Sequence, residues 1–492
     1  MNTIGFDSRQ LLINGRWRAP ASGQTLPLLN PSDGSLLTEI ARGGAVDIAA
    51  AVSAAQAALD GAWGQLSAAE RGRMLLKMSA ITLERADELA RLEALDVGKP
   101  LKQGRADALA LARYLEFYGG AADKVHGDTI PFANGYTAFS LREPHGVTGH
   151  IVPWNYPMQI IGRSVGAALA MGNACVLKPA EEACLSALAF GQIALDAGLP
   201  PGALAIVPGL GEEAGAALSA HPGVAHLSFT GSVAVGQLIQ AAAAQNTIPV
   251  TLELGGKSPQ IVFADADLDA ALPFLVNAGI QNAGQTCSAA SRILVQRSVF
   301  DEVARRMAQR YRALRIAPAL ADADIGPLIS ARQQQIVEGF LASARDSGLA
   351  IVAQAPRPAD LPAGGCYVAP TLLGPADAGH RLAQEEIFGP VQVLIPFGDG
   401  PQDAAAVEAD ALRIANGTAY GLVAGVWTRD GGRALRMARK LHCGQVFINN
   451  YGAGGGIELP FGGVKHSGHG REKGFEALYG FSSLKTVAIK HD

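Results

Sequence analysis

The sequence of 492 residues lacks several features that would place it in a particular class of protein. Its five cysteines are odd in number and form no Cys-x-x-Cys pair, which argues against a disulfide framework and for a reducing compartment. No stretch reaches the roughly 18 consecutive apolar residues of a membrane helix. Residues 1–17 do not have the pattern of a signal peptide. We therefore expect a cytoplasmic protein with no membrane partner.

An excess of either charge is also absent. The chain has 40 Lys and Arg against 44 Asp and Glu, a net charge of -4, so no basic surplus points to a nucleic-acid partner. The histidines do not fall at metal-ligand spacing, and we expect no metal site. Apolar residues make up 49% of the chain, enough for large cores. A chain of this length is expected to form two or three domains.

What is present is a long alternation of strands and helices. From Val147 onwards, apolar strands are expected at residues 147–152, 174–177, 203–207, 225–229 and 250–252. Helices are expected between them at residues 159–171, 184–197, 212–219 and 232–244. This order predicts an α/β fold with a doubly wound parallel sheet. Ligands bind at the carboxyl ends of such strands, where Asn155, Lys178, Thr230 and Glu253 fall.

A second α/β series follows. Its expected strands are residues 259–263, 292–295, 391–396, 422–427 and 446–448. Its expected helices are residues 269–281, 299–314 and 331–347. Residues 135–143 alternate as exposed strands do and suggest a protruding hairpin, and residues 481–490 alternate again.

Helical patterning also precedes the first sheet. Asp47 can cap an Ala-rich helix that ends near Gly61. Ser67 and Glu70 form a capping box ahead of a helix that runs to about Gly98. A further helix is expected at residues 105–118.

Residues 282–288 read NAGQTCS, and we interpret Cys287 as a nucleophile presented by a turn with small neighbours. A lone cysteine is more often buried and inert. Two other motifs change that balance: residues 252–259 read LELGGKSP, and residues 153–157 read PWNYP.

Together these motifs resemble the signature set of the NAD(P)-dependent aldehyde dehydrogenase superfamily, in its hydrolytic form, over essentially the whole chain. The resemblance implies an NAD-binding domain (residues 1–121 and 145–254) and a second α/β catalytic domain (residues 255–456). It also implies a small β oligomerisation arm (residues 122–144 and 470–492). Because unpaired edge strands need cover, a homo-oligomer, either a dimer or a tetramer, is expected.

The resemblance implies that Cys287 attacks an aldehyde and forms a thiohemiacetal, then a thioester. A free thiol is only a few per cent ionised at neutral pH, so the site or the cofactor must assist it. The oxyanion would lie between the Asn155 side-chain amide and the Cys287 backbone N–H. Asn155 could instead be an ordinary turn residue before Pro157.

Glu253 is the expected general base, because its apolar neighbours should raise its pKa toward the working pH. A salt bridge with Lys257 is the alternative. Relatives that pass the acyl group to coenzyme A or phosphate generally have another residue at this position. Glu253 therefore favours water as the acceptor and a carboxylic acid as the product.

The cofactor site has no GxGxxG fingerprint, but residues 229–236 (FTGSVAVG) form a strand-to-helix junction that can face a phosphate. The resemblance implies a set of NAD-binding residues: Trp154, Lys178, Glu181, Gly231, Ser232, Glu386 and Phe388. The carboxylate at Glu181 would repel a 2′-phosphate about 4 Å away by about 4 kcal/mol at an effective dielectric of 20. We therefore expect NAD to be preferred over NADP.

The substrate pocket is the least determined part of the sequence. Tyr118, Tyr156, Phe461 and Phe117 are candidates for an aromatic funnel, with core packing as the alternative. Arg163 follows Asn155 by about two helical turns and matches an arginine that clamps the carboxylate of succinate semialdehyde in relatives. A structural salt bridge is its alternative.

Gln281 stands where those relatives have a second arginine, which favours a larger semialdehyde or an aromatic aldehyde. Lys465, Arg471 and Lys473 are expected to be surface charges. The predicted function is NAD-dependent oxidation of a small-molecule aldehyde to its acid. The alternatives are acyl transfer to coenzyme A and a non-catalytic ligand-binding protein.

Overall fold

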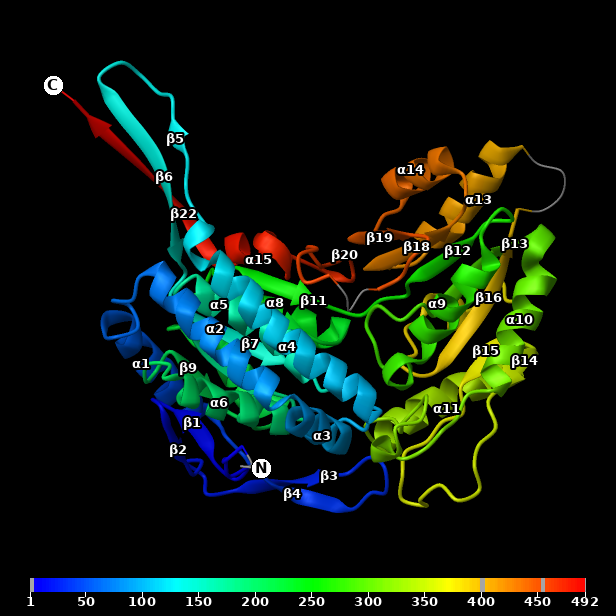
Figure 1. Cartoon of the computed structure of the whole chain (residues 1–492), viewed down its shortest axis with the longest axis horizontal. Coiled ribbons are helices and arrows are strands. Elements are labelled where there is room, and N and C mark those ends of the chain that lie inside the picture. The colour runs from blue at the N-terminus through cyan, green and yellow to red at the C-terminus, as the bar shows by residue number, and fades with distance from the viewer. Residues whose placement is uncertain (1–3, 399–402, 453–455, 492) are drawn as a thin grey trace.

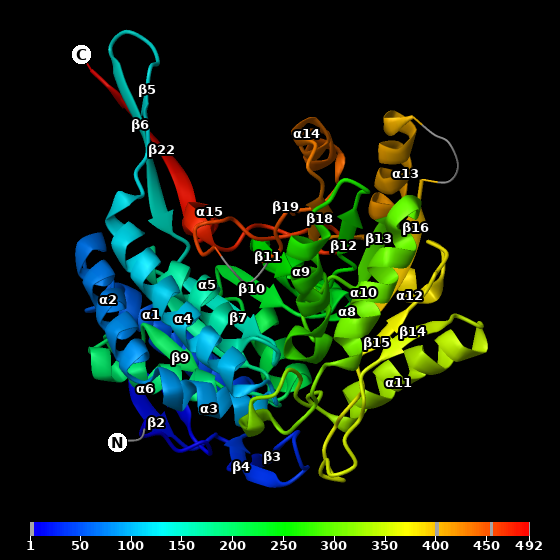
Figure 2. The same ribbon diagram turned by 45° about the vertical axis from the view of Figure 1, so that its right-hand side comes forward.

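The computed structural model describes residues 4–398, 403–452 and 456–491. Two large sheets with flanking helices lie next to each other, and a thin β arm stands away from the first of them (Figures 1 and 2). Most neighbouring strands within the two large sheets run parallel. The predicted α/β class with two sheets is therefore confirmed.

The first sheet has eight strands in the order β2-β1-β9-β8-β7-β10-β11-β21. Its strands are β1 (Leu11–Ile13), β2 (Arg16–Arg18), β7 (Val147–Val152), β8 (Ala174–Pro179), β9 (Leu204–Ile206), β10 (His226–Thr230), β11 (Val250–Glu253) and β21 (Gly468–His469). The helices that follow its parallel strands are α5 (Pro157–Ala170), α6 (Leu185–Ala197), α7 (Ala216–Ala220) and α8 (Val233–Gln245). Every strand predicted for this sheet is present. The strand order reverses between β7 and β10, the position at which such sheets bind ligands.

Four helices precede this sheet in the chain: α1 (Ala45–Asp60), α2 (Ala68–Glu84), α3 (Ala86–Asp96) and α4 (Leu101–Ala121). The capping box is confirmed, because Ser67 Oγ accepts a hydrogen bond from Glu70 N and Glu70 Oε2 accepts one from Ser67 N. The single helix expected after it is wrong, since the chain breaks at Arg85 (φ -104°, ψ 11°). Asp47 is also not the N-cap residue. Gly44 takes that place, and Asp47 accepts the Gly44 N–H from inside the first turn.

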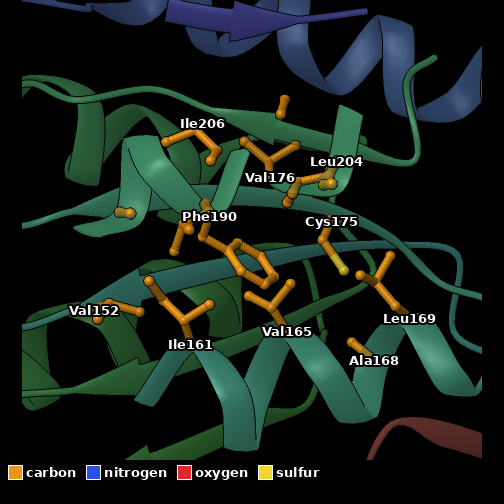
Figure 3. Packing of buried hydrophobic residues seen from close by; sticks show 14 of the residues in the cluster. Val152, Ile161, Val165, Ala168, Leu169, Cys175, Val176, Phe190, Leu204 and Ile206 are labelled. Carbon is orange, nitrogen blue, oxygen red and sulfur yellow. The ribbon is translucent and has the colours of Figure 1, made fainter. Parts of the chain in front are cut away.

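Buried aliphatic side chains join the sheet to α5 and α6. Phe190 lies among Ile161 and Val165 of α5 and Val176 of β8 (Figure 3). Cys175 of β8 is part of the same core and is fully buried. Close packing of this kind leaves little freedom to the strand ends. The residues that follow β7, β10 and β11 are therefore held on a rigid base.

The second sheet has seven strands in the order β14-β15-β16-β13-β12-β18-β19. Its strands are β12 (Pro259–Val262), β13 (Arg292–Gln296), β14 (Ile351–Gln354), β15 (Thr371–Leu373), β16 (Val391–Phe397), β18 (Val423–Trp427) and β19 (Gln445–Ile448). Its helices of ten or more residues are α9 (Leu268–Ile280), α10 (Phe300–Arg312), α11 (Ala331–Asp346), α13 (Ala404–Asn416) and α14 (Gly431–Lys440). The sequence analysis did not predict β14, β15, α13 or α14.

The arm is a three-stranded antiparallel sheet of β5 (Thr129–Ile130), β6 (Tyr136–Pro144) and β22 (Ser482–Lys490). The pairing of β22 with β6 runs without interruption from Ser482 opposite Pro144 to Lys490 opposite Tyr136. The predicted protruding hairpin and the final strand are thus confirmed, and they belong to one sheet (Figure 1).

The shorter elements complete the described chain. They are β3 (Thr25–Leu29), β4 (Leu36–Ala41), β17 (Tyr420–Gly421), β20 (Val464–Lys465), α12 (Arg381–Gln384) and α15 (Gly474–Gly480). No helix within the described residues is both long enough and apolar enough to cross a membrane. The domain boundaries given above stay a prediction, and β21 joins the first sheet from far along the chain.

Candidate active site

Two cavities meet at Cys287. The larger has a volume of about 520 Å³ and lies at the carboxyl ends of the first sheet's strands. The smaller, of about 40 Å³, is called the chamber below. Cys287 and Asn155 line both of them, and Cys287 is half-buried. The alternative of a core cysteine therefore does not describe this residue.

The turn before Cys287 has an unusual backbone. Asn282 (φ 50°), Ala283 (φ 53°) and Gly284 (φ 74°) all have left-handed conformations, which cost a non-glycine residue roughly 1–2 kcal/mol each. A Cβ at Gly284 would lie 2.1 Å from the Gly389 carbonyl oxygen. Hydrogen bonds hold the turn: Asn282 N donates to Gln103 Oε1 at 2.9 Å and Gln285 Nε2 donates to Asn282 O at 3.0 Å. Strain of this kind is typical of functional sites.

Asn155 lies just before α5 and is fastened to the same turn. Its Nδ2 donates to the Gln285 carbonyl at 3.0 Å, and Asn282 Nδ2 donates to the Asn155 carbonyl at 2.9 Å. An amide nitrogen carries two protons, so one N–H remains for a ligand in the chamber. The neighbouring Tyr156 bonds through its hydroxyl to Thr286 Oγ1 at 3.0 Å.

Glu253 is the last residue of β11 and only 1% exposed. Neither of its carboxylate oxygens has a hydrogen-bond partner among the described residues. Burial, and then the nearby Glu472, raise its pKa well above the usual range, while Arg163 opposes them. The expected salt bridge with Lys257 does not form, since Lys257 Nζ is buried without a hydrogen-bond partner in the described chain. The prediction of a raised pKa at Glu253 thus has a structural basis.

The glycines of the LELGGKSP motif allow close packing around the nucleophile. A Cβ at Gly256 would lie 2.4 Å from the Cys287 carbonyl oxygen, and one at Gly255 would lie 2.1 Å from Glu386 Oε2. Burial raises the pKa of the Cys287 thiol to about 11, with the positive charge of Arg163 opposing it. The resting sulfur is therefore a protonated thiol at neutral pH.

Arg163 forms a buried ion pair with Glu472, and the Phe461 ring lies 4.9 Å from its guanidinium carbon. The structural salt bridge left open by the sequence is present, although Arg163 still lines the chamber. Lys473, expected at the surface, is 1% exposed. Burial, and then Arg163, lower its pKa to about 7.

All the residues predicted to bind the cofactor line the larger cavity. They are Trp154, Lys178, Glu181, Gly231, Ser232, Glu386 and Phe388. Lys178 Nζ pairs with Glu181 Oε2 at 2.8 Å, and Ser232 Oγ caps α8 by accepting the Val235 N–H. Glu386 accepts the Gly256 N–H at 3.0 Å, and burial raises its pKa to about 7. The cavity therefore gathers residues from β7, β8, β10 and the loop after α12.

Four of the predicted substrate residues line the chamber: Tyr156, Arg163, Gln281 and Phe461. Tyr118 does not. It is fully buried in α4, stacks on Tyr114 and packs against Gly166 of α5. Phe117 packs edge-on against Phe475. Core packing, the alternative for these two aromatic residues, is the correct description.

The chain matches a known family along almost its whole length. The model of the "Aldehyde dehydrogenase family" matches residues 17–487. The chain belongs to the aldehyde dehydrogenase family. The family resemblance predicted from the motifs is confirmed, and the enzyme is an oxidoreductase that acts on the aldehyde group of its substrate.

Individual relatives of this aldehyde dehydrogenase are similar over their full length. It is 42% identical over 491 residues to aldehyde dehydrogenase family 2 member B4, mitochondrial, of Arabidopsis thaliana, covering 99% of this chain and 89% of the relative. A Burkholderia cenocepacia crystal structure provisionally described as an aldehyde dehydrogenase is 61% identical, with a TM-score of 0.96 and coverage of 98% and 100%. The NAD+ complex of a Bacillus cereus aldehyde dehydrogenase is 36% identical, with a TM-score of 0.94 and coverage of 99% and 97%.

Several residues of this aldehyde dehydrogenase's site were not found from the sequence. Glu472 was missed because its burial depends on pairing with Arg163 from a distant part of the chain. Gln159 and Ser288 line the chamber but belong to no recognised motif. Arg332 lines the larger cavity from the first turn of α11, again without a motif. Among the described residues no group of three or more His, Cys, Asp or Glu could hold a metal ion.

Proposed function

We propose that this aldehyde dehydrogenase oxidises an aldehyde to its carboxylic acid with NAD, using Cys287 as nucleophile, Asn155 as oxyanion donor and Glu253 as general base. The observation that carries the proposal is the position of Cys287 where the large cavity and the chamber meet. A nucleophile at such a junction can face a substrate on one side and a redox cofactor on the other.

The first step belongs to the thiol. Cys287 must lose its proton before its sulfur forms a bond to the aldehyde carbon, because only the thiolate attacks. The charge of Arg163 favours the thiolate, against the effect of burial. As the carbonyl oxygen gains negative charge, the second N–H of the Asn155 amide and the Cys287 backbone N–H would stabilise it. One such donor is worth about 3–4 kcal/mol.

The large cavity suits a dinucleotide. Thr230 Oγ1, at its wall, is buried without a hydrogen-bond partner in the described chain. The first N–H groups of α8 face the same space and can bind a phosphate. Lys178 and Glu181 would hold the adenosine ribose, Ser232 and Gly231 the pyrophosphate, and Glu386 the nicotinamide ribose beside Trp154 and Phe388. A bound nicotinamide would accept the hydride that leaves the adduct, which becomes a thioester on Cys287.

The second half of the reaction belongs to Glu253. Its ionised carboxylate would take a proton from water, the water oxygen would bond to the thioester carbon, and the Cys287 sulfur would leave and regain its proton. The lack of hydrogen-bond partners at Glu253 keeps its oxygens free to accept that proton. We therefore favour water over coenzyme A as the acyl acceptor. The family assignment favours an enzyme over the non-catalytic alternative.

The test is an assay of the purified protein with NAD, a panel of aldehydes and no coenzyme A, following absorbance at 340 nm and the acid formed. Cys287→Ser should lower kcat by at least about 10⁴-fold. Cys443→Ser is the matched control, because the Cys443 thiol is half-buried and contacts the Gln445 carbonyl instead of either cavity. Acid formation that needs coenzyme A, or a fully active Cys287→Ser protein, would refute the mechanism.

Cofactor choice is proposed from the Lys178–Glu181 pair. NAD should be used more efficiently than NADP, since Glu181 would face an added phosphate while Lys178 offsets part of the repulsion. Glu181→Gln should narrow the difference between the two cofactors. Equal kcat/KM for both cofactors in the unaltered protein would contradict this assignment.

Assembly and compartment are also proposals. The arm exposes Ile130, Tyr136, Leu141, Leu484 and Ile489 on its strands, and a second copy of the chain would cover them. We propose a homo-oligomer, a dimer or a tetramer, which light scattering would test. The cytoplasm remains the predicted compartment, although the Arabidopsis relative is named as mitochondrial.

A further inference from the structure

The route from the surface to Cys287 narrows sharply. An outer cavity of about 340 Å³ adjoins the chamber of about 40 Å³. Four residues line both spaces and are called the throat: Gln159, Gln281, Thr286 and Ser288. One water occupies about 30 Å³ in the liquid, so the chamber can hold little more than an aldehyde group. The remainder of a substrate must pass through the throat and lie in the outer cavity.

The charged groups around the chamber are already paired. Arg163 has Glu472 as its partner, and Asp107 is paired with the fully buried Lys99. A substrate carboxylate in the throat would therefore find no uncompensated cation on the chamber side. Burying an unpaired carboxylate costs several kcal/mol. The chamber is built for an uncharged substrate, which argues against Arg163 as a carboxylate clamp.

The amide of Gln159 has a fixed orientation. Its Nε2 donates to Asp107 Oδ1 at 2.5 Å. An ionised carboxylate can only accept hydrogen bonds, so the NH₂ group must face Asp107 and the carbonyl must face away. Within the described chain, Gln159 Oε1 accepts no hydrogen bond. The throat therefore presents a fixed acceptor to whatever passes through it.

The other throat residues differ in how far they are engaged. Thr286 Oγ1 already bonds to the Tyr156 hydroxyl and to the Gln281 carbonyl. The Gln281 side-chain amide makes no hydrogen bond to another described residue. A fixed, partly buried acceptor selects for a donor, because an apolar neighbour would leave it unpaired.

We infer that the throat selects uncharged aldehydes that carry a hydroxyl group close to the aldehyde carbon, with Gln159 Oε1 accepting the hydroxyl proton. This rests on the proposed oxidation at Cys287 and adds the class of substrate. Gln159 is a specificity residue in this account and takes no part in the chemistry at the sulfur. Asp107 and Lys99 are positioning residues that act through Gln159.

The test compares four aldehydes on the unaltered enzyme: butanal, 3-hydroxypropanal, 3-methoxypropanal and succinate semialdehyde. The hydroxyl of 3-hydroxypropanal replaces the terminal methyl of butanal, so size is matched. Its kcat/KM should exceed that of butanal roughly ten-fold, as one hydrogen bond at a partly buried site provides. The methoxy compound, which cannot donate, should show no gain, and succinate semialdehyde should fall below butanal. A preference for succinate semialdehyde, or equal values for the first two, would overturn the inference.

Two variants separate recognition from structural support. Gln159→Met removes the acceptor at similar volume and should bring the ratio of 3-hydroxypropanal to butanal to about one. Asn277→Ala removes an exposed amide of the outer cavity away from the throat and should keep the ratio. A purely structural role for Gln159 would lower both substrates alike and leave the ratio unchanged, which would count against the inference.

The failures can be told apart. An enzyme that oxidises butanal and 3-hydroxypropanal equally well keeps the proposed function and loses only the substrate class. An enzyme that oxidises no aldehyde with NAD loses the proposed function, and the inference with it. If Gln159→Met does not fold, the comparison of the four aldehydes on the unaltered enzyme still decides.

Discussion

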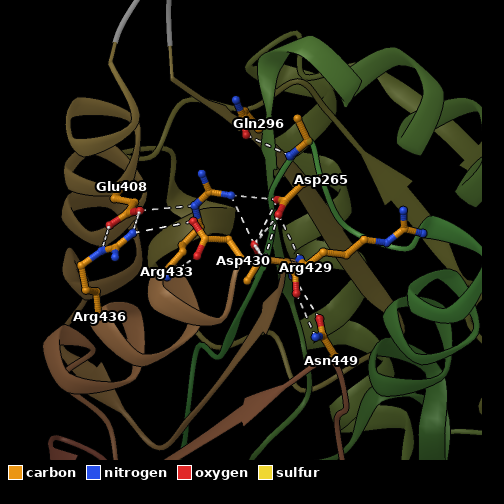
Figure 4. Close-up of polar contacts among 10 residues, drawn as sticks. Asp265, Gln296, Glu408, Arg429, Asp430, Arg433, Arg436 and Asn449 are labelled. Atoms are coloured by element: carbon orange, nitrogen blue, oxygen red, sulfur yellow. Dashed lines mark hydrogen bonds and ion pairs between the residues drawn. The ribbon is translucent and has the colours of Figure 1, made fainter.

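Two polar clusters of this protein treat their charges in opposite ways. Asp265, beyond the end of β12, accepts hydrogen bonds from the Thr428 hydroxyl, from the backbone N–H groups of Arg429 and Asp430, and from the Arg433 guanidinium (Figure 4). Glu408 of α13 is held between Arg433 and Arg436. Hydrogen bonds from Arg436, and then from Arg433, lower the pKa of Glu408.

The catalytic cluster has the reverse pattern. Glu253 is buried without a hydrogen-bond partner in the described chain, and its pKa is raised by burial. Lys257 is buried without a partner on its Nζ, and burial lowers its pKa to about 7. Such groups cost stability, whereas the paired carboxylates near α13 and α14 add to it. The difference suggests that pairing serves the fold, and that its absence keeps acids and bases available for chemistry.

Glu253→Gln is the strongest way to test this contrast. The rate should fall by about 10²–10⁴-fold, because the general base for thioester hydrolysis is lost. The folded-state pKa of Glu253 is raised, so its ionised form opposes folding once the pH exceeds its unfolded value. The variant should therefore melt at the same temperature as the parent at pH 7.5, or higher. A clearly lower Tm would show that Glu253 is a stabilising residue.

Buried histidine gives a second test of the cost of an unpaired group. His150 of β7 is fully buried, its Nε2 bonds to Thr148 Oγ1, and its Nδ1 has no partner among the described residues. Burial lowers its pKa to about 3. The unfolded chain binds the proton near pH 6.5 and the folded one does not, so stability is lost as the pH falls below that value.

The loss from this one group should reach about 2 kcal/mol at pH 5. Urea unfolding at pH 7.5 and pH 5 would measure it, with His150→Gln as the comparison. The variant should lose less of its free energy of unfolding than the parent by that amount. An equal loss in both proteins would remove His150 as a source of acid sensitivity.

The contrast also marks what could be predicted from the sequence. The strands of the first sheet and the positions of Cys287, Asn155 and Glu253 follow from apolar runs and local motifs, which are properties of neighbouring residues. The burial of Glu472 and Lys473 could not be predicted in this way. Both depend on Arg163, which packs against them from a distant helix.

The same reason explains the errors on helices. The pattern at residues 105–118 gave a helix but did not say which face meets the chamber, so Tyr118 was assigned to a funnel and lies in the core. Similarly, the break at Arg85 falls within a continuous helical pattern. The throat residue Gln159 gains its meaning only from Asp107 on a different helix.

Glu408→Gln tests the opposite side of the contrast. Removing the charge held by Arg433 and Arg436 should cost about 1–3 kcal/mol of the free energy of unfolding at pH 7.5, since hydrogen bonds to charged groups are the stronger ones. The kcat with NAD should stay within about two-fold of the parent, because Glu408 lines neither of the two cavities at Cys287. A large loss of kcat in a folded variant would show that this paired cluster also serves the reaction.

Ser67→Ala sets the lower limit of the scale. Ser67 is the exposed N-cap of α2, and the change removes the hydroxyl that accepts the Glu70 N–H while leaving the Glu70 carboxylate bonded to the Ser67 N–H. Loss of such a cap costs about 1 kcal/mol. Urea unfolding should show that loss with kcat unchanged, and Arg73→Ala on the same helix serves as a control without a cap. A Ser67→Ala protein as destabilised as Glu408→Gln would mean that the paired cluster contributes no more than an ordinary surface cap, and the contrast with the catalytic site would then rest on Glu253 alone.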